Sequence, residues 1–155
     1  MLFFKRYVIL LRDDGGKTMK NAISGSIIEL TVNDLKECAS FWDFPNKLAE
    51  PIKNGEKKAF AYKIGDSFVG GCALSVSEEA CGHFSYFSVA PDFRGKGIGS
   101  RLIDFAAKYF KETDLGEMRL HVDKDNSDAI RLYERKGFVY ECDATPERIA
   151  MVKTI

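Results

Sequence analysis

The segment Val89–Ser100 reads VAPDFRGKGIGS, and three of its glycines stand at alternate positions just before an apolar helical pattern. Glycine loses more backbone freedom on folding than other residues, so this clustering indicates that bare backbone is needed here. Amides at the start of a helix are unpaired and carry partial positive charge, which suits a phosphate group. Arg94 and Lys96 would add positive charge. The segment predicts a pyrophosphate-binding loop, with a tight strand-to-helix turn as the alternative.

Two other phosphate-binding loops do not fit the spacing. A dinucleotide-binding loop requires G-x-G-x-x-G, whereas Gly95, Gly97 and Gly99 form G-x-G-x-G. The stretch Gly16-Lys17-Thr18 matches the end of a Walker loop, but Leu11 occupies the position of the leading glycine. We therefore interpret Gly16-Lys17-Thr18 as a hairpin turn.

The sequence around the glycine loop predicts a mixed α/β domain. Runs rich in β-branched and aromatic residues indicate strands, and apolar residues at helical spacing indicate helices. Strands are expected at residues 7–11, 26–32, 58–64, 67–76, 83–89, 118–122, 138–142 and 148–153, and helices at 35–42, 98–110 and 126–136. Asn126 is expected to cap the last helix and Gly137 to end it. The front half is expected to be mainly antiparallel, and the back half to follow a β-α-β-α-β order.

Length and charge suit one domain over residues 1–155. The formal net charge is zero, which argues against electrostatic binding of nucleic acid or of an anionic membrane over a broad surface. The N-terminal stretch MLFFKRYVILL is interrupted by Lys5 and Arg6, and it falls short of the roughly 20 apolar residues of a membrane span. We therefore expect an extra N-terminal strand or hairpin in about residues 1–25, and a cytoplasmic protein.

The cysteines show no metal-binding spacing. Cys38, Cys72, Cys81 and Cys142 form no C-x-x-C pair, and neither histidine follows them at the spacing of a zinc finger. This pattern predicts four reduced thiols in a reducing compartment, and no metal.

Two blocks of the sequence resemble a known family. The segment Val89–Leu102 resembles the acyl-CoA-binding motif of the GNAT acetyltransferases, Arg/Gln-x-x-Gly-x-Gly/Ala, with Arg94, Gly97 and Gly99 at the specified positions. The block Asn126–Phe138, NSDAIRLYERKGF, is similar to the family pattern Asn-x-x-Ala-x-x-Leu-Tyr-x-x-x-Gly-Phe at every specified position. The two blocks and their strands cover about residues 83–138, and the strand expected at 7–11 departs from the family order.

The resemblance implies a central mixed, mostly antiparallel sheet flanked by helices. Its middle strands, at residues 83–89 and 118–122, would splay apart to admit coenzyme A. The pyrophosphate would be held by the backbone amides of Arg94, Gly95, Lys96, Gly97, Ile98, Gly99 and Ser100. The Val89 N–H would face the acetyl carbonyl in an oxyanion-hole role. Asn126 would contact the pantetheine arm, although its capping role alone also explains this residue.

The resemblance also suggests an acid and a base. A lysine-like amine, with a pKa near 10.4, is neutral in only about one molecule in a few thousand at pH 7, so a base matters. His83 is the candidate base, at a place where the family often carries Glu or His. Strand alternation puts His83 and Val89 on one face unless a bulge intervenes. Tyr133 is the candidate general acid toward the departing thiolate. The alternatives are a histidine that only packs and a tyrosine on the core face.

The sequence thus predicts an acetyl-CoA-dependent N-acetyltransferase that acts by direct transfer in a ternary complex, since neither motif block contains a cysteine. The acceptor is either a small amine or a protein N-terminus or lysine, and acyl chain length is left open. Its binding site is expected at Phe41–Pro45 and Asp143–Glu147, where core packing of the aromatic residues is the alternative. A non-catalytic acyl-CoA-binding or sensor module is the rival function. A homodimer, paired through the N-terminal strand, is a further open alternative.

Overall fold

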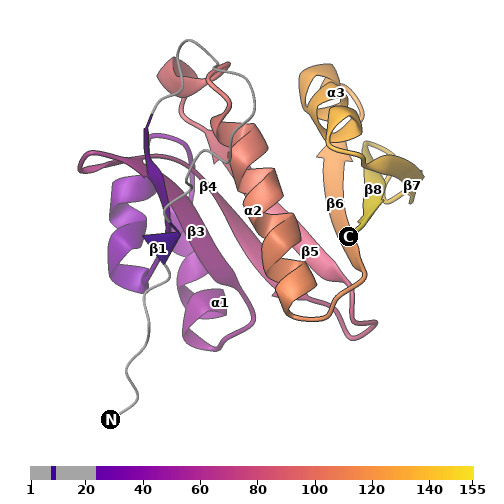
Figure 1. Cartoon of the computed structure of the whole chain (residues 1–155), viewed down its shortest axis with the longest axis horizontal. Coiled ribbons are helices and arrows are strands. Elements are labelled where there is room, and N and C mark those ends of the chain that lie inside the picture. Colours follow the sequence, from indigo (N-terminus) through magenta and orange to yellow (C-terminus); the bar gives the residue numbers. More distant parts are fainter. Residues whose placement is uncertain (1–7, 10–23) are drawn as a thin grey trace. The chain divides into compact units, whose positions relative to one another are not determined.

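The computed structural model describes residues 8–9 and 24–155 of the chain (Figure 1). The described residues belong to two compact units, one within Met1–Ala73 and Tyr86–Leu102, the other within Leu74–Ser85 and Ile103–Ile155. Three elements contribute residues to both units: β4 (Ser67–Val76), β5 (Gly82–Val89) and α2 (Ile98–Glu112). The single domain expected over residues 1–155 stays a prediction.

One eight-stranded sheet runs through the fold, and its first strands have the order β1-β2-β3-β4-β5, with β1/β2 and β2/β3 paired antiparallel. Its first three strands are β1 (Val8–Ile9), β2 (Ser26–Glu29) and β3 (Lys58–Ile64). β1 pairs with β2 through Val8↔Ile28, which places a strand within the expected residues 7–11. The turn expected at Gly16-Lys17-Thr18 lies outside the described residues.

Short helices complete the first unit. They are the 3-10 helices η1 (Val32–Cys38), η2 (Pro45–Leu48) and η3 (Pro91–Phe93), and the α-helix α1 (Ala49–Lys53). The helix expected at 35–42 is wrong in type and bounds. The Asp34 carboxylate accepts hydrogen bonds from the Thr31 N–H at 2.7 Å and the Thr31 hydroxyl at 2.8 Å, so the helical segment begins at once after Thr31.

A hydrophobic cluster fills the first unit. It joins side chains of the helices to those of the strands: Leu30, Leu35, Cys38, Phe41, Trp42, Leu48, Ala59, Ala61, Phe68, Ala73 and Ala90. Gly71 is required by this packing, because an added Cβ would lie 2.9 Å from atoms of both the Phe41 and the Trp42 rings. β4 therefore approaches these rings with its backbone.

The second unit has the strand order β4-β5-β6-β8-β7, with β6 (Glu117–Asp123), β7 (Val139–Asp143) and β8 (Arg148–Thr154). β5 and β6 are parallel, with pairs Gly82↔Met118 and His83↔Arg119, and the opening expected between their remaining residues stays a prediction. β8 is antiparallel to both β6 and β7. Figure 1 shows α3 (Ser127–Arg135) beside these C-terminal strands. The mixed, mostly antiparallel α/β fold is confirmed.

Local signals account for the helix ends in the second unit. The Asn126 side chain accepts a hydrogen bond from the Ala129 N–H at 3.2 Å, which confirms the expected cap of α3. Gly137 follows that helix with φ +87°, a conformation that favours glycine and confirms the expected stop. Among the described residues, no helix is long and apolar enough to cross a membrane.

Candidate active site

The glycine loop lies between η3 and α2 in the first unit. Gly95 and Gly97 have φ of +73° and +82°, and a Cβ at either position would meet no atom within 4 Å. Glycine is therefore required there by backbone conformation, and the space beside that backbone is open. The Arg101 N–H bonds to the Gly97 carbonyl at 3.1 Å, so the amides of residues 98–100 precede the first bonds along the helix.

The two basic residues of this loop make different contacts. The Arg94 Nε donates to the Val89 carbonyl at 2.9 Å, which folds this side chain back onto the end of β5. The Lys96 ammonium lies 5.5 Å from the centroid of the Phe93 ring. Arg94 thus closes the loop onto the strand that precedes it, a role that the motif spacing alone did not predict.

The end of β5 is held tightly against β4 in the first unit. The Ala90 N–H donates to the Val69 carbonyl at 2.8 Å. A Cβ at Gly70 would lie 3.1 Å from the Ser88 carbonyl oxygen and 3.3 Å from the Val89 side chain. These contacts therefore fix the position of Val89 at the end of β5, from which the chain continues into the glycine loop.

The left-handed backbone of Tyr86 interrupts the regular conformation of β5, an irregularity termed here the Tyr86 bulge. This residue has φ +51°, in the left-handed region that bulky residues rarely adopt. This left-handed residue lies between His83 and Val89, so simple strand alternation does not carry from one to the other, and their shared face stays a prediction. The Trp42 Nε1 donates to the Tyr86 carbonyl at 2.6 Å, across 44 residues of sequence.

His83 lies at the beginning of β5, in the second unit. Its ring is half-buried and lies 6.4 Å, centroid to centroid, from the ring of His121 on β6, at an interplanar angle of 79°. Both rings lie on one face, because His83 is in register with Arg119 and His121 follows Arg119 by two residues. His121 was not among the predicted site residues, and its alternate spacing to Arg119 in the strand after the glycine loop is the sequence signal that could have found it.

Charged groups beside the two imidazoles are paired with one another. Arg119 donates two hydrogen bonds of 2.7 Å to the Glu141 carboxylate and lies 4.0 Å from Glu79. Asp123 lies 3.1 Å from Arg148. Nearby positive and negative charges thus offset one another on this face.

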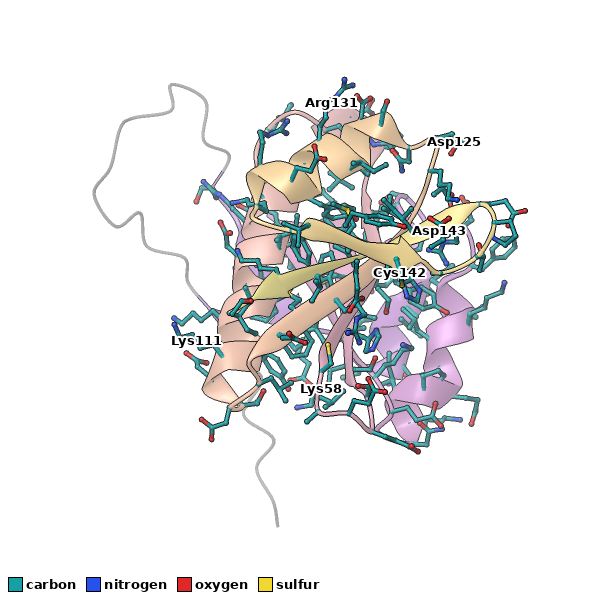
Figure 2. All side chains as sticks on the ribbon, turned by 90° about the vertical axis from the view of Figure 1, so that its right-hand side faces the viewer. Lys58, Lys111, Asp125, Arg131, Cys142 and Asp143 are labelled. Atoms are coloured by element: carbon teal, nitrogen blue, oxygen red, sulfur yellow. The ribbon has the colours of Figure 1, made fainter. Side chains whose placement is uncertain are left out.

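Tyr133 lies on α3 and is buried at 6% exposure, with its ring 5.8 Å from that of Phe138. This packing agrees with the core-face alternative for its ring, and the general-acid role stays a prediction. On the same helix, Arg131 is exposed and pairs with Asp128 at 2.6 Å. Figure 2 shows Arg131 at the outer side of α3.

The two segments expected to bind the acceptor belong to different units. Phe41 and Trp42 are buried at 8% and 6% exposure, so they are core residues, whereas Phe44 is 67% exposed with the Lys47 ammonium 4.7 Å from its ring centroid. Residues 143–147 form an exposed turn of the second unit, in which Asp143 pairs with Lys124 at 3.0 Å. Figure 2 shows Cys142 and Asp143 together on β7.

The four cysteines are free thiols. Burial, with a smaller effect from Asp34 and Glu37, raises the pKa of Cys38 to about 12. Burial also raises the pKa of Cys72 and of Cys81, and Cys142 is exposed. In the described part of the chain, no three side chains of His, Cys, Asp or Glu are grouped as metal ligands.

Comparisons with known proteins identify the family. Residues 27–138, more than half of the chain, match the model of the acetyltransferase (GNAT) family, and the chain belongs to that family. This confirms the resemblance carried by Val89–Leu102 and Asn126–Phe138.

Named relatives are similar to parts of the chain. N-alpha-acetyltransferase 30 of Xenopus laevis is 30% identical over 117 residues, which cover 73% of this chain and 41% of that protein. Mycothiol acetyltransferase of Geodermatophilus obscurus is 37% identical over 60 residues, which cover 39% of this chain and 20% of that protein. The chain thus spans less than half the length of these relatives.

Solved structures share the fold. PaiA N-acetyltransferase from Thermoplasma acidophilum, in complex with coenzyme A, has a TM-score of 0.74 at 20% identity and covers 85% of this chain and 99% of that chain. The GNAT domain of S. lividans PAT has a TM-score of 0.72 at 14% identity over 97% of each chain. At these identities the likeness supports the fold alone.

Proposed function

We propose that this protein transfers an acetyl group from acetyl-CoA directly to a primary amine in a ternary complex. The observation that carries the proposal is the loop at Gly95 and Gly97, where left-handed backbone and open space precede the first turn of α2. Unpaired amides at a helix start bind phosphate oxygens, so this loop fits a pyrophosphate. Membership of the GNAT family and the coenzyme A complex of the PaiA structure support this ligand.

Different residues of the chain would bind acetyl-CoA and transfer the protons of the reaction. Amides of residues 95–100 would hold the pyrophosphate, since the Arg94 N–H already donates to the Pro91 carbonyl at 3.3 Å. The Val89 N–H would donate to the acetyl oxygen as negative charge develops on it. Asn126 would contact the pantetheine arm. His83 would take the proton that the acceptor amine loses, and Tyr133 would give a proton to the departing sulfur. A thiol with a pKa of about 8.5 leaves readily, so the demand on Tyr133 is mild.

The acceptor is the amine of a small molecule or of a peptide. The relative named N-alpha-acetyltransferase 30 supports a peptide N-terminus, and the relative named mycothiol acetyltransferase supports a small molecule. We favour the peptide, because the first of these matches extends over 73% of the chain. We also propose that the protein works in the cytoplasm, where four free thiols stay reduced.

Thiol release tests this function against that of a non-catalytic acyl-CoA-binding module. Purified protein is mixed with acetyl-CoA and a panel of peptides and small amines, and free coenzyme A is measured. Release on addition of an amine supports the enzyme, whereas thermal stabilisation by acetyl-CoA and by CoA but not by NAD, without any release, supports the binding module.

A double variant tests the assigned residues. His83→Gln with Tyr133→Phe should lower the rate at least a hundredfold, since general acids and bases contribute about 10²–10⁴-fold. Arg131→Gln on the exposed side of α3 is the matched control and should keep the rate. A double variant that turns over at the wild-type rate would remove both assignments, though not the function.

A further inference from the structure

Tyr86 occupies a strained position in the middle of β5. Its φ of +51° lies in the left-handed region, where a bulky side chain crowds the backbone. Glycine or asparagine would adopt this conformation more easily. Residues held in such conformations persist only where the surrounding structure fixes them, and they concentrate at active sites and ligand contacts.

Trp42 holds the backbone at Tyr86 by a hydrogen bond. Its Nε1–H donates to the Tyr86 carbonyl at 2.6 Å, and its indole is buried at 6% exposure. The Trp42 ring packs edge-on against Phe41 at 4.8 Å, and Gly71 leaves room for both rings. The donor to the bulge is therefore itself rigid.

The bulge turns the Tyr86 ring toward solvent. This side chain is 39% exposed, and its ring lies edge-on to Trp42 at 6.5 Å. The Lys57 ammonium lies 6.0 Å from the centroid of the ring. Within the described residues, the Tyr86 hydroxyl makes no hydrogen bond. The bulge thus presents an apolar ring with a polar tip three residues before Val89.

We propose that Tyr86 is a specificity-determining residue that contacts the acceptor beside its amine, and that Trp42 is its positioning residue. This inference rests on the proposed function, in which the Val89 N–H donates to the acetyl carbonyl oxygen. Bulges next to active sites re-aim side chains, and strand geometry puts a residue three positions away within about 10 Å.

The chemistry of this contact favours one acceptor class. The ring offers apolar surface and its hydroxyl offers a hydrogen bond, and Lys57 already supplies a cation near the ring. An amine whose neighbouring carbon carries an apolar group and an amide satisfies both features. The acceptor class is therefore a peptide N-terminus with an apolar first side chain, in preference to a polyamine.

The test compares three probes, four single variants and the double variant of Tyr86→Gly with Trp42→Phe. The probes are a tripeptide with N-terminal leucine, the same tripeptide with N-terminal glycine, and spermidine. Tyr86→Gly removes the ring but keeps the conformation, Tyr86→Phe removes the hydroxyl, and Trp42→Phe removes the donor. Tyr109→Phe is the matched control, because Tyr109 lies on α2 outside the segments assigned to substrate binding.

In the wild type, kcat/KM should be highest for the leucine peptide. Tyr86→Gly should lower that value at least tenfold and abolish the preference over the glycine peptide, while the KM for acetyl-CoA changes less than twofold. Its melting temperature should fall only slightly, because relief of the left-handed strain offsets part of the lost ring burial. Introduced into the wild type, Trp42→Phe should lower the kcat/KM for the leucine peptide. Introduced into Tyr86→Gly, it should lower this value no further, as expected of a residue that acts through Tyr86.

Two outcomes overturn the inference in distinguishable ways. An active wild type whose Tyr86→Gly variant keeps its kcat/KM and its peptide preference overturns the inference alone. A wild type that binds acetyl-CoA and acetylates no amine overturns the proposed function and this inference with it. If Tyr86→Gly does not fold, Tyr86→Asn gives the same test, because asparagine tolerates the left-handed conformation.

Discussion

At the scale of single residues, glycines in this protein serve two different physical purposes. Gly95 and Gly97 are needed for their backbone angles, and a Cβ there would meet open space. Gly82 is needed for space, since an added Cβ would lie 2.6–2.8 Å from atoms of the Phe110 ring. The sequence pattern led us to the first purpose, because those glycines cluster. It could not reveal the second, because the Phe110 ring comes from a distant helix.

This difference predicts separable effects of adding one methyl group. Gly82→Ala should destabilise the protein by about 1–3 kcal/mol through overpacking, with unchanged acetyl-CoA affinity. Gly97→Ala should cost about 1–2 kcal/mol of backbone strain and should also weaken acetyl-CoA binding at least tenfold. Urea unfolding and ligand titration measure the two effects. Equal losses of affinity in both variants would show that the loop is not the phosphate site.

Thiol reactivity is a second prediction at this scale. The raised pKa of Cys38, about 12, and the raised pKa values of Cys72 and Cys81 keep these buried thiols protonated at pH 8. Exposed Cys142 should therefore react first with a disulfide reagent, and the other three should react only on unfolding. Cys142→Ser should abolish the fast phase. A fast phase of two or more thiols would contradict the described burial.

At the scale of elements, local signals predicted boundaries well and long-range contacts escaped prediction. Asn126 and Gly137 limit α3 because capping acts within a few residues of sequence. The left-handed backbone of Tyr86 is hydrogen-bonded to Trp42, 44 residues away, and no local sequence signal predicts this contact. The contact of Thr31 with Asp34 is local, and it begins η1 at Val32, three residues before the expected start of that helix.

Asn126 provides an element-scale prediction that separates capping from ligand binding. Asn126→Asp keeps an oxygen acceptor for the Ala129 N–H, so the stability of the protein should stay within about 0.5 kcal/mol of the wild type. Asn126→Ala removes the cap and should cost about 1 kcal/mol. If Asn126 also contacts the pantetheine arm, both variants should bind acetyl-CoA more weakly. Normal affinity in Asn126→Asp would leave Asn126 as a cap only.

At the scale of the whole molecule, the two compact units are linked by shared elements. β4, β5 and α2 each contribute residues to both units, so unfolding either unit removes partners from elements of the other. The family motifs predicted the order of these elements, because each motif stands at a strand-to-helix junction. They could not predict the grouping into units, which depends on how many contacts each segment makes and not on local sequence.

Sharing of these three elements predicts one cooperative unfolding transition. The chain has a single tryptophan, Trp42, which is buried in the first unit, so its fluorescence reports that unit while far-ultraviolet circular dichroism reports the whole chain. The two urea curves should superimpose, as two-state unfolding requires. Acetyl-CoA at about 100 times its Kd should raise the free energy of unfolding by about 2.7 kcal/mol for both probes. A fluorescence transition at lower urea than the dichroism transition would show that the first unit unfolds separately, and the ligand would then shift the two curves by different amounts.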